Sequence, residues 1–289
     1  MVEKFVLGTA NFGMEYGIAC GRKLSKQEAF EILDIALFRG IWGVDTAVAY
    51  GEAHNVLGEY VRQKHKSFRV ITKLPAWDYQ SCEDVYSLVI KSLETLGIPK
   101  LKVLMIHSFQ TFTKYKDFLI KCLKNLKKRE LIENYGISVY HPEEVFEFYK
   151  FTEESFAVEF PINVFDRRFL PYLKSWKGDG LELFARSIFL QGLFFLEEEK
   201  LKGVFQRVKN KIISLRELSK EFNISVACIC LNFVASFEEL DGIVVGVDNP
   251  QQLINNFQCL EKRINLEDKL RAFEVKDEDI LLPYRWYAF

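Results

Sequence analysis

Four polar side chains of this sequence have the types and spacing needed to hand over a proton. Asp45, Lys73 and His107 each come directly after a short apolar run, where a buried strand would end. Taken singly, each of these residues also fits a purely structural role as the polar residue that ends a buried strand. A buried aspartate and a buried lysine both need partners, and the simplest arrangement pairs Asp45 with Lys73. Tyr50 follows a few residues after Asp45, so a turn would bring its hydroxyl to the same place.

Together these side chains would make a proton donor for a carbonyl group that accepts hydride. A phenol ordinarily ionises near pH ~10, and an adjacent ammonium lowers that value. We therefore expect Lys73 to lower the pKa of Tyr50, while Asp45 keeps Lys73 charged and fixed in place. A neutral His107 would donate a hydrogen bond to the substrate oxygen. General acids of this kind give a rate gain of ~10²–10⁴-fold.

The apolar runs that position these residues alternate with segments of helical period along the whole chain. The runs are near-continuous in hydrophobicity, which is typical of strands buried on both faces of a parallel sheet. They cover residues 5–7, 41–44, 70–71, 103–106, 136–139, 156–158, 181–185 and 243–245. Eight such strands without a linker predict an α/β fold, one eight-stranded parallel β/α (TIM) barrel that forms a single domain over residues 1–289. In a parallel barrel the downstream strand ends share one rim, so the polar residues would meet there.

A doubly wound sheet is the alternative fold. It is disfavoured because no GxGxxG fingerprint follows the first strand, and the spacing in Gly8-Thr-Ala-Asn-Phe-Gly13 is wrong for one.

Helix boundaries are marked by several local signals. Ser25-Lys-Gln-Glu28 is a capping box, and Gly40 would close that helix. An apolar stripe at helical spacing runs from Val85 to Leu96, followed by Gly97. Pro142 and Pro250 stand where a first helical turn would begin, and two helices are expected over residues 209–222 and 225–236.

Composition excludes several classes of function. The 39 Lys and Arg residues against 40 Asp and Glu give a net charge of -1, so no basic excess exists to bind a nucleic acid. The most apolar stretches, 187–196 and 226–235, are far shorter than the ~20 residues of a membrane span, and the first residues do not resemble a signal peptide. We expect a cytoplasmic protein without nucleic-acid or membrane partners.

Cysteine and histidine spacing argues against a metal or redox centre. The six cysteines form no CxxC, and the four histidines never fall at HxH or HExxH spacing. We expect no metal, and we expect the cysteines to be buried thiols that pack as small apolar residues.

The ordered motifs resemble those of the aldo-keto reductases. They are Gly8-Thr-x-x-Phe-Gly13, Asp45-Thr-Ala-x-x-Tyr50-Gly, Asn55-x-Leu57-Gly58, the strand ends at Lys73 and His107, and Gly136-Ile-Ser138. The resemblance covers essentially the whole chain, and the DTAxxYG block with the later Lys and His is its most specific part.

The resemblance implies a β/α barrel that binds a nicotinamide coenzyme without a Rossmann fold. It implies a catalytic tetrad of Asp45, Tyr50, Lys73 and His107, in which Tyr50 delivers the proton to the carbonyl oxygen. It assigns the coenzyme contacts to Gly8, Thr9, Asp45, Ser138, Glu159, Arg186, Ser187, Phe189, Gln191, Gly192, Gly246, Asp248, Gln252 and Asn256. Ser187–Gly192 would cover the pyrophosphate.

The sequence gives opposing indications on whether NADPH or NADH is preferred. Family frequency favours NADPH. The loop after the eighth strand, however, contains no basic residue for a 2′-phosphate and carries Asp248, which would suit a ribose hydroxyl and NADH. We favour NADP(H) by a small margin, with NAD(H) as the alternative.

Four departures from the family pattern concern the coenzyme and the barrel floor. Val139 replaces the usual Asn after Ser138, Glu159 replaces a Gln, and Arg186 replaces an aromatic residue that stacks on the nicotinamide. Glu159 would still accept a bond from the carboxamide, and the planar Arg186 would stack instead. Only four residues precede the first strand, which leaves little room for an N-terminal hairpin.

An aromatic wall is expected around the substrate, a small-molecule carbonyl compound. Its candidate residues are Phe12, Tyr16, Trp77 and Trp286. Such a wall suits sugars, aromatic aldehydes or steroids, and the segment 14–18 resembles that of bacterial members associated with carbohydrate metabolism. The aromatic tail from Leu282 either lids this pocket or seals an apolar groove. The alternative function is a coenzyme-binding regulatory subunit, and the sequence does not indicate the oligomeric state.

Overall fold

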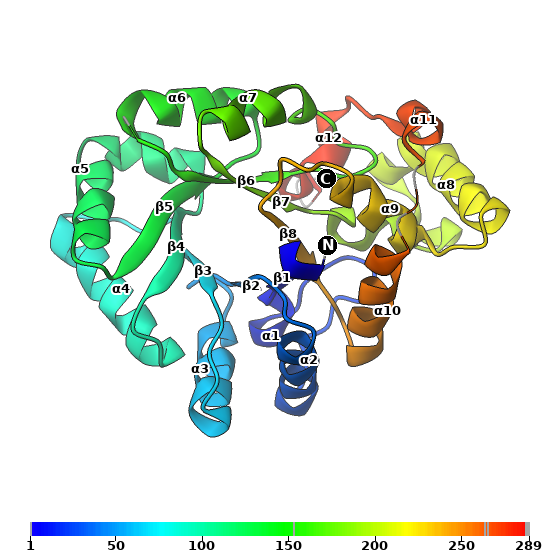
Figure 1. Cartoon of the computed structure of the whole chain (residues 1–289). Coiled ribbons are helices and arrows are strands. Elements are labelled where there is room, and N and C mark those ends of the chain that lie inside the picture. The colour runs from blue at the N-terminus through cyan, green and yellow to red at the C-terminus, as the bar shows by residue number, and fades with distance from the viewer. Residues whose placement is uncertain (1, 153, 263, 265, 287–289) are drawn as a thin grey trace.

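A closed barrel of eight parallel strands forms the centre of the molecule (Figure 1). The structure, a computed structural model, describes residues 2–152, 154–262, 264 and 266–286. The strands are β1 (Phe5–Gly8), β2 (Gly43–Asp45), β3 (Val70–Leu74), β4 (Leu101–Ile106), β5 (Ile132–Ser138), β6 (Ala157–Pro161), β7 (Glu182–Arg186) and β8 (Gly242–Gly246). Each strand pairs with its neighbours in chain order, and β8 pairs with β1. The predicted barrel is confirmed, and the doubly wound sheet is excluded.

Helices surround this barrel, as Figure 1 shows. The α-helices are α1 (Ala10–Gly13), α2 (Lys26–Phe38), α3 (Ala53–Lys64), α4 (Cys82–Leu96), α5 (Phe109–Lys128), α6 (Pro142–Thr152), α7 (Leu173–Gly178), α8 (Lys209–Glu221), α9 (Val226–Ala235), α10 (Pro250–Glu261), α11 (Glu267–Leu270) and α12 (Glu278–Leu281). Short 3-10 turns cover Val2–Lys4, Leu170–Tyr172, Leu190–Phe195, Glu198–Lys200, Gly203–Val208, Arg271–Phe273 and Pro283–Arg285.

Local sequence signals set the helix ends where they were expected. The Ser25 hydroxyl accepts from the Glu28 amide, and the Glu28 carboxylate accepts from the Ser25 amide at 2.9 Å, which completes the capping box of α2. Gly97 ends α4 in the left-handed conformation, with φ of 69°. Asn249 caps α10, and Pro250 occupies its first turn.

A small apolar cluster fills the barrel interior below the strand ends. Val6, Ile71, Val103, Met105, Ala157 and Phe184 are all buried there. Trp42 meets Phe184 edge to face at 5.2 Å, so aromatic rings pack at the upstream ends of the strands. The described residues before β1 form the turn Val2–Lys4.

The expectation that all cysteines are thiols is wrong. Cys82 and Cys122 form a disulfide between α4 and α5, and Cys228 and Cys259 form another between α9 and α10. Cys20 and Cys230 are free. Each disulfide joins residues 31 or more positions apart, and only the packing of neighbouring helices brings their Cα atoms to 5.3 and 5.0 Å. Sequence spacing does not reveal such pairs.

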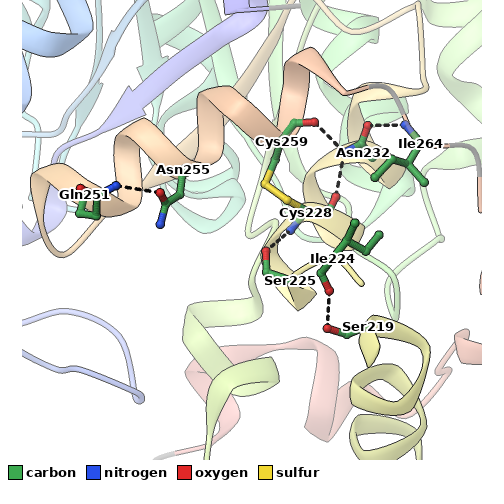
Figure 2. Close-up of a disulfide and its surroundings, with 9 residues drawn as sticks. All are labelled: Ser219, Ile224, Ser225, Cys228, Asn232, Gln251, Asn255, Cys259 and Ile264. Atoms are coloured by element: carbon green, nitrogen blue, oxygen red, sulfur yellow. Dashed lines mark hydrogen bonds between the residues drawn. A yellow bond between two sulfur atoms is a disulfide. The ribbon is translucent and has the colours of Figure 1, made fainter. Parts of the chain in front are cut away.

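The surroundings of the second disulfide tie two helices together (Figure 2). The Asn232 side-chain amide donates to the carbonyls of both Cys228 and Cys259 at 3.0 Å. Its oxygen accepts from the Ile264 amide at 2.9 Å. One buried asparagine therefore holds α9, α10 and the chain after α10 in register.

In the described part of the chain, no single helix is long and apolar enough to cross a membrane. One pair, Gly203–Glu221 and Val226–Ala235, passes by length and composition only and is bent by 93°. Most residues of Val226–Ala235 are buried inside the protein.

Candidate active site

The downstream ends of the strands bring the predicted polar residues to one rim. Gly8 pairs in register with Asp45 on one side and with Gly246 on the other. Ser138 pairs with Glu159 across β5 and β6. Because all strands run in parallel, residues far apart in sequence meet at this end of the barrel.

Two glycines position Tyr50 over that rim. The turn after β2 is closed by a hydrogen bond from the Tyr50 amide to the Ala47 carbonyl at 3.0 Å. A Cβ on Gly13 would lie 1.7 Å from the Tyr50 carbonyl oxygen, so only glycine allows α1 to approach this turn. Gly51 follows with φ of 53°, a conformation that favours glycine, and its Cβ would meet the Gly13 carbonyl at 2.5 Å.

The four predicted catalytic side chains converge. Lys73 donates a hydrogen bond to Asp45, and both side chains are almost fully buried. The Lys73 ammonium lies 5.6 Å from the centre of the Tyr50 ring. The His107 ring stands nearly perpendicular to the Tyr50 ring at 5.9 Å. The predicted pairing of Asp45 with Lys73 is present, and within the described residues no hydrogen bond joins Lys73 to the Tyr50 hydroxyl.

The expected fall in the pKa of Tyr50 is not found. Burial raises the pKa of Tyr50, and Lys73 lowers it by less than burial together with the Asp45 and Glu159 carboxylates raises it. The sequence predicts one carboxylate, Asp45, beside Lys73, whereas the structure places two there, Asp45 and Glu159. Tyr50 is therefore protonated at neutral pH.

His107 is uncharged at neutral pH, which is the state predicted from the sequence. Burial, together with the positive charge of Lys73, lowers the pKa of His107 to about 4. Its imidazole is thus neutral at pH 7 and can donate one hydrogen bond.

One pocket of about 290 Å³ opens beside Tyr50 and Asp45. It is lined by nearly all of the expected coenzyme residues: Gly8, Thr9, Asp45, Glu159, Arg186, Ser187, Phe189, Gln191, Gly192, Gly246, Asp248, Gln252 and Asn256. Ser138 is the exception, because its hydroxyl is turned to Glu159, to which it donates at 2.9 Å. The pocket thus runs from Tyr50 and Asp45 to α10.

Arg186 is held by the protein itself. It donates to the Val139 carbonyl at 2.9 Å and lies 3.4 Å from a Glu159 oxygen. Its guanidinium stacks 4.2 Å from the centre of the Tyr140 ring. The position expected to stack on a nicotinamide is therefore a fixed cation beside Tyr50.

Two loops meet over the pocket. Ser187, Leu190 and Gln191 have positive φ, and Gly192 has φ of 93°. The Ile18 amide donates to the Gln191 carbonyl at 2.9 Å, so the loop after β1 is joined to the loop after β7. This arrangement encloses the section of pocket expected to hold a pyrophosphate.

The expected aromatic wall is only partly present. Tyr16 lines the pocket. Phe12 is 1% exposed and packs in the main core, where the short α1 directs it inward. Trp77 is 56% exposed and lies outside the pocket lining.

The C-terminal tail seals an apolar groove as far as it is described. The Trp286 ring packs edge to face on Phe205 at 4.9 Å, and its indole donates to the Ile280 carbonyl at 3.2 Å. Trp286 is therefore a core residue and not a wall residue. Residues 287–289 of the tail lie outside the described residues.

Two residues near the loop after β8 were not predicted from the sequence. Asn11 lines the pocket, and its amide nitrogen donates to the Val247 carbonyl at 2.5 Å. Arg22 donates to the Asp248 carbonyl at 2.6 Å and pairs with Glu28. Both come from the chain after β1, so no local signal links them to residues 246–252.

No group of three or more His, Cys, Asp or Glu side chains suited to a metal ion occurs among the described residues.

Comparison with known proteins identifies the family. The family model described as the Aldo/keto reductase family matches residues 4–272. The chain belongs to this family. Membership makes it an oxidoreductase of the aldo-keto type, a class that uses nicotinamide coenzymes and acts on small-molecule carbonyl compounds.

Individual relatives agree with this assignment. The "Uncharacterized oxidoreductase YqkF" of Bacillus subtilis (strain 168) is 24% identical over 306 residues, which cover 98% of this chain and 100% of the relative. The holo form of the aldo-keto reductase AKR11C1 from Bacillus halodurans superposes with a TM-score of 0.75 at 19% identity, covering 93% of this chain and 90% of that chain. The glycerol dehydrogenase AKR11B4 from Gluconobacter oxydans gives 0.71 at 19% identity, covering 97% and 91%. At these identities the two structures show a shared fold.

Proposed function

We propose that this aldo-keto reductase is an NAD(P)H-dependent enzyme that reduces an aldehyde or ketone to an alcohol, with Tyr50 as the proton donor. The observation that carries the proposal is the convergence of Tyr50, Lys73, Asp45 and His107, of which Tyr50 and Asp45 line one pocket. A cytoplasmic location remains an expectation.

Each side chain has a separate task in this proposal. The Tyr50 hydroxyl, protonated at neutral pH, donates its proton to the carbonyl oxygen. Neutral His107 donates a hydrogen bond to the same oxygen and so orients it. The Lys73 ammonium, fixed by Asp45, stabilises the phenolate that remains on Tyr50 until solvent reprotonates it. The reduced nicotinamide, when bound, supplies the hydride to the carbonyl carbon.

The residues lining the pocket fit such a coenzyme. The Asn11 side-chain oxygen is buried and has no hydrogen-bond partner among the described residues, so it can accept a bond from a ligand. Gln252 and Asn256 line the same end. Glu159 and Arg186 would meet the nicotinamide, and 187–192 the pyrophosphate.

We favour NADPH over NADH by a small margin. Asp248 lines the adenosine end of the pocket and would repel a 2′-phosphate. Family frequency supports NADPH nevertheless, and Arg22, although paired with Glu28, places a guanidinium at the Asp248 carbonyl. Fluorescence titration with both coenzymes decides the preference, and tighter binding of NADH would overturn it.

For the substrate we propose a sugar-related carbonyl compound. The chain segment 14–18 resembles that of carbohydrate-metabolising bacterial members, and Tyr16 within it lines the pocket. An aromatic face beside polar groups suits a sugar ring.

Tyr50→Phe tests the function. With a panel of aldehydes and ketones we expect the parent protein to oxidise NAD(P)H, and the variant to lose about 10²–10⁴-fold in kcat. Coenzyme affinity measured by fluorescence should stay near that of the parent, because the ring is retained. Tyr149→Phe, at an exposed tyrosine of α6, is the matched control and should keep full activity.

The rival function is a coenzyme-binding regulatory subunit. The altered carboxamide site favours it, since Ser138 is bound to Glu159 instead of facing the pocket. Coenzyme binding without turnover on any carbonyl of the panel would support this rival and end the reductase proposal.

A further inference from the structure

Glu159 gives the catalytic lysine a second carboxylate. It lies in the middle of β6, is 1% exposed and faces the barrel interior. One oxygen accepts from the Ser138 hydroxyl at 2.9 Å and lies 3.4 Å from Arg186. The other lies 3.2 Å from the Lys73 ammonium and accepts no hydrogen bond from the described residues. Lys73 therefore sits between Asp45 and Glu159.

This second carboxylate changes what Lys73 does to Tyr50. A lysine with one anionic partner and a free face attracts a neighbouring phenolate strongly, whereas a lysine between two anions attracts it much less. Burial raises the pKa of Tyr50, and the charges of Asp45 and Glu159 raise it further against Lys73. Burial also opposes ionisation of Glu159, but Lys73 and Arg186 outweigh it and lower its pKa, so this carboxylate is charged at neutral pH.

The charged and titratable groups facing this cluster come from every side of the rim. They are Asp45 from β2, Tyr50 from the turn after β2, Lys73 from β3, His107 after β4, Tyr140 after β5, Arg186 from β7 and Tyr16 from the loop after β1. Burial and the Glu159 charge raise the pKa of Asp45 to about 8. Above that pH, Asp45 and Glu159 are both negative and balance Lys73 and Arg186.

We propose that Glu159 is a positioning residue that acts through Lys73: its carboxylate, 3.2 Å from the Lys73 ammonium, competes with Tyr50 for the charge of that lysine and so sets how readily Tyr50 gives up its proton. Reduction needs the phenol, which gives its proton to the carbonyl oxygen. Oxidation needs the phenolate, which removes the alcohol proton. A glutamine at this position would leave Lys73 with Asp45 alone and free its charge for Tyr50. The role of Glu159 in catalysis rests on the proposed reductase function, whereas its electrostatic effect on Tyr50 does not.

Glu159→Gln tests the proposal without turnover. The amide is nearly isosteric and can still accept from Ser138, so the change removes mainly the charge. The ultraviolet absorbance of tyrosinate is measured as a function of pH. The titration curve of the matching Tyr50→Phe variant is then subtracted from that of each protein, which leaves the contribution of Tyr50. We expect phenolate to form at least one pH unit lower in Glu159→Gln than in the parent. Glu133→Gln, at an exposed strand glutamate paired with Lys102, is the control and should leave the titration unchanged.

A second readout is the pH profile of kcat/KM for carbonyl reduction. Its loss at high pH should move to lower pH by the same amount in Glu159→Gln, so that one unit above its new midpoint the variant retains about a tenth of its own activity at neutral pH. A merely structural role for Glu159 would lower activity at every pH alike.

Three outcomes separate the possibilities. An unchanged or higher Tyr50 titration in Glu159→Gln overturns the proposal, whatever the activity. A lowered titration in a protein that reduces no carbonyl supports the effect of Glu159 and ends the reductase function. Should Glu159→Gln not fold, Glu159→Asp decides, because a shorter side chain withdraws the carboxylate from Lys73 and must lower the titration by a smaller amount; no movement overturns the proposal.

Discussion

At the scale of single residues, the main feature of the site is the pairing of buried positive and negative side chains. Lys73 and Arg186 bring two positive charges into a buried region, and Glu159 brings a negative one, to which Asp45 adds a second above its raised pKa of about 8. Buried charges persist only when they are paired, because desolvation of an unpaired ion costs several kcal/mol. Lys73 is the centre of this balance, since both carboxylates contact it.

Removal of Lys73 should therefore show a distinctive pH dependence. In Lys73→Met the Asp45 and Glu159 carboxyls face each other without the cation, and we expect a loss of about 3–5 kcal/mol in the free energy of unfolding at pH 7. The pair would then titrate higher in the folded state than the ~4 of the unfolded chain. Protonation is therefore favoured by folding, and the variant should become more stable relative to the parent as pH falls from 7 towards 5.

Urea unfolding at several pH values measures this effect. Lys66→Met, at an exposed lysine, is the matched control and should be neutral throughout. A constant deficit between pH 5 and 7 would show that the two carboxyls do not interact through the space that Lys73 fills.

At the scale of elements, the contact between α1 and the turn after β2 places the proton donor. The Gly13 backbone lies against the Tyr50 carbonyl, and Gly51 turns back towards Gly13. Neither glycine belongs to a regular strand or a long helix. The motif residues that carry the family resemblance therefore include backbone positions whose task is steric.

Gly13→Ala should displace Tyr50. Its Cβ would fall 1.7 Å from the Tyr50 carbonyl oxygen, which forces α1 and the turn apart. We expect a loss of about 1–3 kcal/mol in stability and a fall in kcat that exceeds the fall in coenzyme affinity. Gly178→Ala, where a Cβ meets nothing within 4 Å, is the control and should be silent in both assays. Equal behaviour of the two variants would show that this approach does not position Tyr50.

At the scale of the whole molecule, barrel closure and two disulfides fix the arrangement of the outer helices. The disulfides join α4 to α5 and α9 to α10. Ala227 on α9 and Asn256 on α10 both line the pocket. The second disulfide thus holds together two helices that shape one end of the pocket.

Breaking that disulfide should loosen the molecule as a whole. For a separation of 31 residues, Cys228→Ala is expected to lower the free energy of unfolding by about 3–4 kcal/mol under oxidising conditions. The same difference should shrink strongly after reduction with dithiothreitol. Cys20→Ala, at an exposed free cysteine, is the control. Peptide mapping without reduction would refute the pairing if it found Cys228 and Cys259 alkylated as free thiols.

The sequence determined the repeating order of strands and helices, the caps of α2, α4 and α10, and the four polar residues that meet at the rim. These features depend on local patterns: buried parallel strands are continuously apolar, capping residues act within one turn, and polar strand ends must share a rim once the barrel closes. For the same reason the departures at Glu159 and Arg186 were visible as residue types.

The tertiary structure alone decided which groups those residues contact. Glu159 contacts Lys73, and the Ser138 hydroxyl donates to Glu159. Phe12 and Trp286 pack in the core. Cys228 forms a disulfide with Cys259 and is not a free thiol. Each of these contacts joins positions distant in the chain, and each sets an energy that depends on distance and burial. Charge and dielectric at one point in space have no counterpart in sequence spacing, so the raised pKa of Tyr50 could be found only once the barrel had brought its neighbours together.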